Sequence, residues 1–410
     1  MTNSHTMTPP DEVTLSVARG TIGGDRFSVA RIPGTRTLGI TVVVPVGTTH
    51  EQQGEAGFAH LSEHLVHQGA RDEHGCLIEE RVLAVGGLSN AQTYPFHTEY
   101  SFVIPAPGWH DLPGWVDLAR RRIAPSSIAV ADVGRETAVI RQEVARRMTS
   151  SPVAGFPWIE ALGTLSSDYG LRHNGFSDLT DLAQASVSDV EQFLDRTHRR
   201  CGYSVAIAGP WEPGDVMDAV GGVIGEGRPV PDALAGALDG PHHRQGTVPT
   251  LMAVDASVRL VPGSSSTGPE ASTAAAMVAA QWADLVQPRT HWQLGLFGPT
   301  MGPDRNILIG SRPSTSGTAV PRFPSELADD TRPLLARAIA NALDTVDKTL
   351  SSTGTLSALA ARDSTFGWDS LSLRRQIGQV SVRDVEDYLY RVAGTPAGTL
   401  RSTAEAAEAA

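Results

Sequence analysis

One stretch near the N-terminus, Gly57 to Gly69 (GFAHLSEHLVHQG), constrains the chain more than any other. In a helix, His60 and His64 lie one turn apart on the same face, where both imidazoles can bind one metal ion, and Glu63 borders that face. This is the inverted zincin pattern, H-x-x-E-H. Neutral imidazoles suit Zn2+, and a carboxylate beside the ion can take a proton from a water that the ion acidifies. The pattern therefore predicts metal-assisted hydrolysis.

A second predicted helix, Asp132 to Arg147, supplies a candidate third ligand, and we select Glu143 for that role. The alternative, a helix with two solvated histidines, predicts no such partner. Between the two helices, Gly86 to Ala106 is rich in Thr, Tyr, Phe and Val, which is typical of a hairpin or a pair of strands. One face of the second helix carries residues at helical spacing: Glu136, Val139, Ile140, Glu143 and Arg147.

These three blocks, in this order and spacing, resemble the M16 metallopeptidases, the family that includes insulin-degrading enzyme, pitrilysin and the mitochondrial processing peptidase. In that family, H-x-x-E-H is followed by an N-A-x-T strand with T-x-Y behind it, and then by a helix with two glutamates. The matching residues of this sequence are Asn90, Ala91 and Thr93, then Thr98 and Tyr100, then Glu136 and Glu143.

The resemblance implies both a fold and a set of residue roles. The fold is α+β, with two tandem homologous α/β-roll domains, each a mostly antiparallel sheet with helices packed on it. The strand with Asn90 and Ala91 would be the edge to which a substrate peptide adds as an extra strand. The implied roles at the metal centre are Zn2+ ligands at His60, His64 and Glu143, a catalytic base at Glu63 and a supporting carboxylate at Glu136.

The sequence departs from the family pattern near these blocks. His67 stands where the family usually has an aromatic residue. We interpret it as a packed or solvated histidine and not as a fourth ligand, because catalytic zinc keeps one position open for water. Gln92, Tyr94 and Phe96 are also unusual within the strand block, and they can alter which side chains the substrate groove accepts.

Length, charge and cysteine usage exclude several other classes of protein. The 410 residues suit two or three domains. A net charge of −12 without a basic stripe argues against nucleic-acid binding. We see neither a membrane span nor a secretory signal, so we expect a cytoplasmic protein without membrane contact. Cys76 and Cys201 are far apart, which argues against a disulfide framework or a thiolate metal site.

The second half of the sequence resembles a copy of the first. Gln184 to Arg196 (QASVSDVEQFLDR) recurs as Gln379 to Arg391 (QVSVRDVEDYLYR). Both segments begin with the helix-capping pattern S-x-x-D, which alone could produce part of the match. The agreement beyond the cap favours duplication. We predict a zinc-bearing catalytic domain at 12–224, a linker at 225–250, a non-catalytic M16-like domain at 251–400 and a disordered tail at 401–410.

The copy lacks the features that the first half carries. Pro269 to Val286 stands where the zinc helix stood but has no histidine, so it should serve only packing. Active M16 proteins carry an Arg and a Tyr seven residues apart in this domain, which hold the substrate backbone. Arg289 is present here, but Leu296 stands in place of the Tyr. We therefore expect a heterodimer with a paralogous M16 subunit that carries the Arg/Tyr pair, with a homodimer as second choice.

The function that the sequence predicts is zinc-dependent endopeptidase activity on short or unfolded peptides, which a dimer of two-domain chains would enclose in a chamber. Leader-peptide processing is compatible with such an enzyme. The alternative is a non-catalytic M16-like scaffold or peptide-binding subunit, which we disfavour because the expected ligands and the base are all present. A serine hydrolase is disfavoured because Gly263 to Gly268 (GSSSTG) lacks the G-x-S-x-G elbow.

Overall fold

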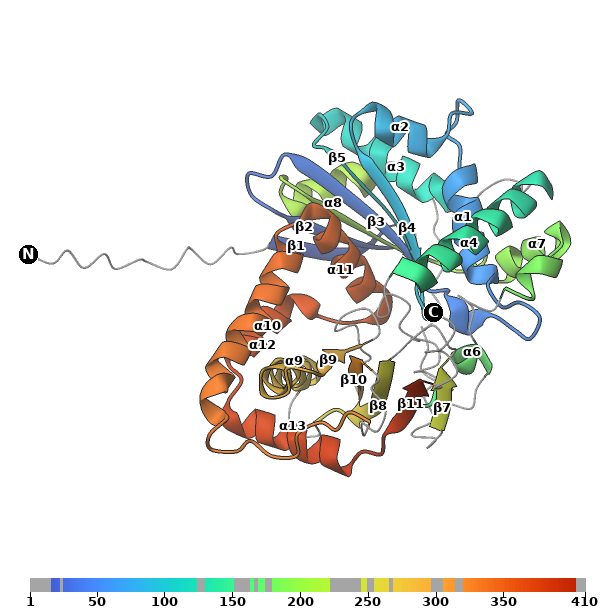
Figure 1. Ribbon diagram of the computed structural model, residues 1–410. Helices are drawn as coiled ribbons and strands as arrows, with labels where there is room; N and C mark the ends of the chain where they lie inside the picture. The colour runs from blue at the N-terminus through green and yellow to red at the C-terminus, as the bar shows by residue number, and fades with distance from the viewer. Residues whose placement is uncertain are drawn as a thin grey trace, which may run out of the picture.

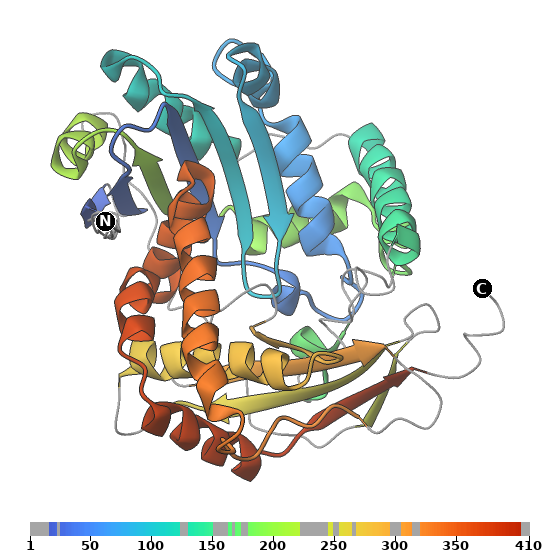
Figure 2. The same cartoon turned by 60° about the vertical axis from the view of Figure 1, so that its left-hand side comes forward.

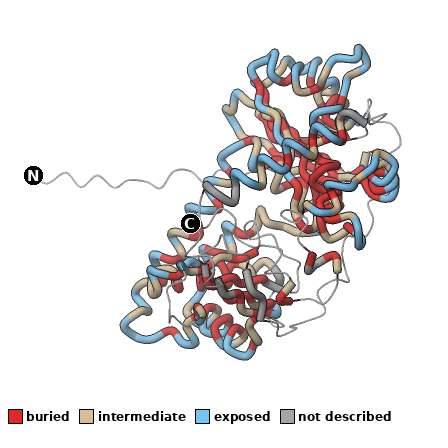
Figure 3. Tube along the Cα trace, turned by 45° about the vertical axis from the view of Figure 1, so that its right-hand side comes forward, coloured by how far each residue is buried: buried red, intermediate tan, exposed pale blue. Residues whose placement is uncertain are grey.

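The computed structural model describes residues 16–22, 25–123, 130–150, 163–165, 169–173, 179–221, 245–248, 254–264, 268–295, 305–313 and 320–402. These residues form two β-sheets with helices packed on them, which confirms the α+β class (Figure 1). Buried residues gather in two groups, one in each half of the molecule (Figure 3). None of the helices within these ranges combines the length and the apolar composition that a membrane crossing needs.

The first sheet has six strands in the order β1-β2-β6-β3-β5-β4. β2 and β6 are parallel, and the other neighbours are antiparallel. The hairpin that the sequence predicted at Gly86 to Ala106 is the β4–β5 pair. β4 is an edge strand, and within the described residues it pairs only with β5. The strands are β1 (Ser16–Ile22), β2 (Asp25–Arg31), β3 (Thr37–Val44), β4 (Leu88–Thr93), β5 (Thr98–Pro105) and β6 (Ser204–Gly209).

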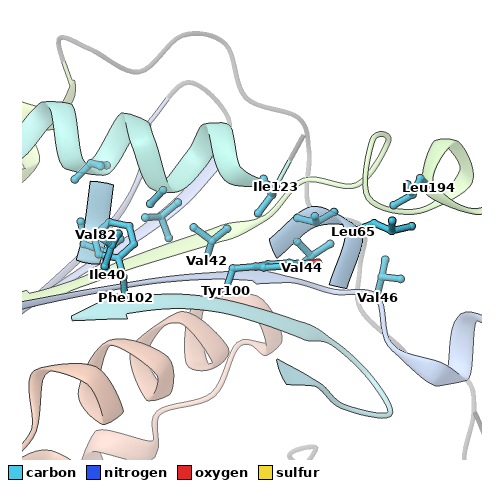
Figure 4. Close-up of a cluster of buried hydrophobic side chains, with 14 of the residues drawn as sticks. Ile40, Val42, Val44, Val46, Leu65, Val82, Tyr100, Phe102, Ile123 and Leu194 are labelled. Carbon is cyan, nitrogen blue, oxygen red and sulfur yellow. The ribbon is translucent and has the colours of Figure 1, made fainter. Parts of the chain in front are cut away.

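Helices pack on one face of this sheet through alternating strand residues. Val42 and Val44 of β3 and Tyr100 of β5 are almost completely buried, and they lie in one cluster with Leu65 of α1 and Ile123 (Figure 4). Burying an aliphatic side chain of this size stabilises a fold by about 1.5–3 kcal/mol, so this layer fixes the helices on the sheet. The helices of the first half are α1 (Phe58–Gly69), α2 (Ile78–Ala84), α3 (Leu112–Arg122), α4 (Val130–Ser150), α6 (Tyr169–Arg172), α7 (Val187–Arg196) and α8 (Pro213–Gly221).

The second sheet repeats the topology of the first. Its order, β7-β11-β8-β10-β9, matches β2-β6-β3-β5-β4 strand for strand, and β7–β11 is the parallel pair that corresponds to β2–β6. The repeat confirms the tandem homologous halves that the sequence predicted. The elements are β7 (Gln245–Val248), β8 (Val254–Pro262), α9 (Pro269–Val286), β9 (His291–Leu294), β10 (Arg305–Pro313), α10 (Leu335–Leu350), α12 (Leu373–Gly378), α13 (Val382–Gly394) and β11 (Gly398–Ser402).

The recurring S-x-x-D segments form the same local structure in both halves. Ser186 begins α7, and its hydroxyl accepts a hydrogen bond from the backbone N–H of Asp189 at 3.2 Å. Ser381 begins α13 and accepts from the N–H of Asp384 at 3.3 Å. In each case the aspartate accepts from the serine N–H in return. These are complete capping boxes, and each helix precedes the corresponding strand, β6 or β11.

Two predicted boundaries need correction. β7 lies inside the predicted linker 225–250, and residues 401 and 402 of the predicted tail belong to β11, where they pair with β7. The sequence concealed both strands because Gly and Pro surround the first and because the pairing joins segments that are far apart in the chain. Residues 222–244, 249–250 and 403–410, which contain the rest of the predicted linker and tail, lie outside the described residues.

A helix of the second half, α11 (Thr353–Phe366), packs on the other face of the first sheet (Figure 2). A Cβ atom at Gly39 of β3 would lie 2.3 Å from the carbonyl oxygen of Thr353, so only glycine permits this approach. The hydroxyls of Thr41 and Ser357 lie 2.8 Å apart in a buried hydrogen bond. This contact could not be predicted from the sequence, because the many small residues of α11 do not indicate which surface the helix packs against.

An ion pair continues the contact at the β4–β5 hairpin. Arg362 of α11 lies 3.0 Å from the carboxylate of Glu99 in β5, and both side chains are largely buried. His97, which ends the turn of the hairpin, lies 2.9 Å from the same carboxylate. The pKa of Glu99 is lowered, because the attraction of Arg362 and His97 outweighs the opposing effect of burial. The edge hairpin of the first sheet is thus fixed by the second half of the chain.

We predict that stability depends on His198, which is fully enclosed beside the Tyr100 hydroxyl at 3.2 Å. Burial lowers the pKa of His198 to about 4. Between about pH 6.5 and 4, the unfolded chain therefore binds a proton that the folded chain does not, and stability falls as pH falls through this window.

Thermal unfolding measured from pH 7 to 4 checks this prediction. His198→Gln should show a shallower loss of melting temperature with falling pH than the wild type. His74→Gln, at an exposed position, is the matched control and should keep the wild-type slope. Identical slopes in all three proteins would contradict the prediction.

Candidate metal centre

The helix with H-x-x-E-H, α1, begins at a site that has no capping side chain of its own. Its first residue follows Gly57, which has a positive φ of 91°. The buried carboxylate of Glu51 takes the place of a cap: it accepts from the N–H groups of Gly57 at 3.1 Å and Ala59 at 2.8 Å. His173 donates to the same carboxylate at 2.5 Å. A negative charge at a helix N-terminus stabilises it, so Glu51 fixes where α1 starts.

The imidazoles of α1 and a carboxylate of α4 converge on one point. His60 Nε2 lies 3.7 Å from Glu143 Oε2, and His64 Nε2 lies 3.5 Å from the same oxygen. His60 is buried, while the side chains of His64 and Glu143 retain 14% and 20% exposure. The three residues that the sequence assigned as ligands therefore meet, and their meeting point is partly open to solvent.

Glu63 lies at the same point but is held differently. Its carboxylate lies 3.9 Å from His60 Nε2 and accepts a hydrogen bond from the Thr93 hydroxyl of β4 at 3.2 Å. One ligand atom from each of His60, Glu63 and His64 can lie within 4.8 Å of the others, so Glu63 is also close enough to bind an ion. Glu143 is the better ligand, because one of its oxygens faces both Nε2 atoms. Burial raises the pKa of Glu63 to about 7.

Glu136 orients one of the imidazoles. Its carboxylate accepts from His64 Nδ1 at 3.2 Å and from Arg135 Nε at 3.0 Å. A proton on Nδ1 leaves the lone pair of Nε2 directed to the meeting point, which is the form that a metal requires. Burial alone would lower the pKa of His64, but its contacts with Glu143, Glu63 and Glu136 raise it.

The donor set fits zinc. Two imidazoles and one carboxylate are a known ligand set of catalytic zinc sites, with a fourth position left for water. Three carboxylates, of Glu63, Glu136 and Glu143, surround two imidazoles in a largely buried place. Such an excess of negative charge is unfavourable without a cation, and a divalent ion at the meeting point would offset it.

The predicted substrate strand borders the cluster. Asn90 and Ala91 lie on edge strand β4, opposite Ser101 and Tyr100 of β5. The backbone carbonyls of Asn90 and Ser101 both accept from Arg122, at 3.1 Å each, which places these carbonyls between the two strands. Antiparallel pairs alternate, so the N–H and C=O of Ala91 are directed to the open edge.

Arg122, at the end of α3, is a buried residue that sequence reasoning missed. Its side chain is 1% exposed, lies over the Tyr100 ring at 5.5 Å, and contacts His67 of α1. Burial lowers the pKa of Arg122 to about 10 and that of His67 to about 3. His67 thus faces α3 and not the ligand cluster. In the sequence, Arg122 is the last of three consecutive arginines and resembles a solvated helix end.

The second half has no equivalent cluster in the part of the chain that the structure describes. α9 replaces α1, carries no histidine and is buried along most of its length, as predicted. Arg289 lies exposed in the turn between α9 and β9. Leu296, the position where a Tyr was expected, lies outside the described residues, as does part of the Gly263 to Gly268 loop.

Comparison with known proteins gives consistent results. Residues 26–152 match the family model described as insulinase (peptidase family M16). An uncharacterized zinc protease of Mycobacterium leprae is 35% identical over 136 residues, which cover 33% of this chain and 30% of the relative. Subunit 1 of the mitochondrial cytochrome b-c1 complex of Bos taurus is 24% identical over 182 residues, 44% of this chain and 37% of that subunit. The chain spans about a third of the length of these curated relatives.

The solved structures extend the comparison to the whole fold. The structure of a protease from Helicobacter pylori matches this chain with a TM-score of 0.72 at 14% sequence identity. The match covers 95% of this chain and 100% of the protease chain. The described chain is a two-domain α+β protein with two sheets of equal topology, and the cluster of His60, Glu63 and His64 lies on α1 of the first half. Residues 26–152 of the chain form a domain that matches peptidase family M16, and this stretch contains α1, the β4–β5 hairpin and α4.

We predict that Arg122 stabilises the fold around the edge strand. Arg122→Met removes the hydrogen bonds that the guanidinium donates to the carbonyls of Asn90 and Ser101 and its contact with His67, which should lower the free energy of unfolding by about 2 kcal/mol or more. Arg121→Met is the matched control: Arg121 is half-exposed on the same helix, and its ion pair with Asp117 is at the surface. That variant should change stability by less than about 1 kcal/mol. Urea unfolding of both variants measures the difference, and equal effects would contradict the prediction.

Proposed function

We propose that this chain is a zinc-dependent endopeptidase of the inverted zincin type. The observation that carries the proposal is the convergence of His60 Nε2 and His64 Nε2 on one oxygen of Glu143, with the Glu63 carboxylate beside them. In the alternative, a non-catalytic M16-like subunit, a base beside three metal ligands would have no function. The zinc-protease name of the Mycobacterium leprae relative supports the same conclusion.

Each residue of the cluster has a separate role in the proposed reaction. His60, His64 and Glu143 would hold zinc, and Glu136 would keep His64 in the right tautomer. When bound, zinc supplies Lewis acidity that polarises a carbonyl and acidifies a water. Glu63 takes a proton from the attacking water and returns it to the leaving amine nitrogen. A pKa of about 7 suits both transfers near neutral pH.

The substrate would be a short or unfolded peptide. It would add to β4 as an extra antiparallel strand, with the outward backbone groups of Ala91 as its hydrogen-bonding partners. Only an extended segment can make such contacts, so folded proteins would be excluded. The Thr93 hydroxyl connects this strand directly to Glu63, so a peptide added to β4 would lie close to the proposed base.

We further propose that the chain acts as the zinc-bearing subunit of an M16 dimer that encloses the peptide, with a paralogous subunit as the preferred partner. The relative in the cytochrome b-c1 complex is by name a subunit of a larger assembly, which supports this idea. Leader-peptide processing is one substrate class that such an enclosed site suits. The cytoplasmic location stays a prediction.

Replacement of the base tests the catalytic assignment. Glu63→Gln should retain about one zinc per chain and lower cleavage of a quenched fluorescent peptide library by about a thousandfold, because it removes only the proton transfer. Glu80→Gln, at an exposed position on α2, is the matched control and should keep full activity. Unchanged cleavage in Glu63→Gln would contradict the role of Glu63.

Zinc content and oligomeric state test the remaining assignments. Glu143→Gln and His64→Ala should each lose bound zinc and activity together. Analytical ultracentrifugation of the purified chain, combined with the cleavage assay, then addresses the partner. Zinc with negligible cleavage by the chain alone supports the heterodimer. Robust cleavage by a homodimer would contradict the need for a paralogous subunit and leave the zinc assignment intact.

A further inference from the structure

A groove on the second half of the chain is lined by three arginines from three segments. Arg289 lies in the turn between α9 and β9, Arg312 near the end of β10, and Arg322 in the segment that follows. The groove has a volume of about 520 Å3 and adjoins a second hollow of about 410 Å3 that shares Arg289 and Arg312. Volumes of this size are typical of small-ligand sites.

None of these arginines forms an ion pair with a carboxylate among the residues that the structure describes, although Asp255 of β8 stands opposite Arg312 of β10. Arg312 also has a buried Nε with no hydrogen-bond acceptor. Among the described residues that line the two hollows, one is acidic, Asp284, and it is already engaged: it accepts from the Trp292 N–H at 2.6 Å and lies 3.5 Å from His291. Three like charges around one groove repel one another, and a buried donor without an acceptor is unfavourable.

The contrast with the rest of the chain makes the cluster unusual. The protein carries a net charge of −12, so carboxylates are plentiful. Arg120, Arg199 and Arg374, for example, each pair with an aspartate at 2.6–2.8 Å. An external anion in the groove would therefore supply the negative charge that the described part of the chain does not provide to these arginines.

The walls of the groove are held in place by hydrogen bonds. Gln287, at the end of α9, donates from Nε2 to the carbonyl of Arg322 at 3.2 Å. The Oε1 of the same side chain accepts from the indole N–H of Trp292, which is buried in β9. The segment that carries Arg322 is thus tied to the helix and the strand that flank Arg289. The three guanidinium groups are presented together before any ligand arrives.

We propose that this groove binds the carboxylate groups of an acidic peptide segment. Guanidinium groups match carboxylates with two parallel hydrogen bonds, and such pairs are stronger than neutral ones. Pro288, Val320 and Pro321 also line the groove and offer apolar surface to the methylene groups of Glu or Asp side chains. A lone inorganic ion would leave that surface uncovered. The proposal rests on the proposed function in one respect, that peptides are the ligands of this protein.

Binding of two matched peptides to the Glu63→Gln chain tests the proposal, since that background keeps the peptides intact. One fluorescein-labelled peptide contains several Glu residues, and the other has Gln at each of those positions. Fluorescence anisotropy at low salt should give a Kd for the Glu peptide about tenfold or more below that for the Gln peptide. The difference should shrink as salt is added, because salt screens the charges.

Substitutions assign the effect to the groove. Arg312→Gln and Arg322→Gln should each weaken binding of the Glu peptide about tenfold and leave binding of the Gln peptide unchanged. Arg322 is exposed, so its substitution keeps the test valid even if Arg312→Gln impairs folding. Arg337→Gln, on the exposed face of α10, removes the same charge elsewhere and should have no effect.

Three results would overturn the proposal: equal affinity for the two peptides, equal weakening by Arg337→Gln, or inorganic phosphate binding to the groove without any preference for the Glu peptide. The last result would make the groove a site for small anions. The outcome is separable from the proposed function. If the wild type cleaves no peptide but the chain still binds the Glu peptide through the arginines, the proposed peptidase activity is wrong and the proposal for the groove stands.

Discussion

The accumulation of carboxylates around two imidazoles is the constraint on which the rest of this structure depends. Glu63, Glu136 and Glu143 come from two helices, and the repulsion between their carboxylates would separate these helices unless other contacts held them. Several contacts hold the two helices in place. Glu51 fixes the start of α1, the Thr93 hydroxyl holds Glu63 against β4, and a shared core holds both helices on the sheet. The preorganised charge is what makes the site selective for a cation.

Duplication provided the same framework twice, and only one copy carries this charge. In the first half, α1 presents ligands to a partly open cluster. In the second half, α9 is an Ala-rich helix that is buried along most of its length, so it contributes packing and no chemistry. The two halves are still interdependent. α11 crosses from the second half to cover the first sheet, and Arg362 pairs with Glu99 beside the edge hairpin.

The sequence predicted the parts of the site that are encoded locally. Helical spacing sufficed to bring His60, Glu63 and His64 together. The second predicted helix supplied Glu143, and family resemblance added the role of Glu136. The hairpin followed from a stretch that is rich in Thr, Tyr, Phe and Val. The long-range features could not be predicted in this way. Each of them depends on where a distant segment packs. The missed features are Glu51 as a cap, Arg122 behind the edge strand, β7, the placement of α11 and the arginine groove.

The position of β11 has a consequence for the order in which the molecule assembles. β11 lies between β7 and β8, although it follows them in the chain by about 140 residues, and β7 has no other partner among the described residues. During synthesis, α11 emerges before β11 and can already dock on the completed first sheet, while the second sheet still has a gap. The second sheet must therefore close last, and until then the edges of β7 and β8 offer unpaired backbone groups to other chains.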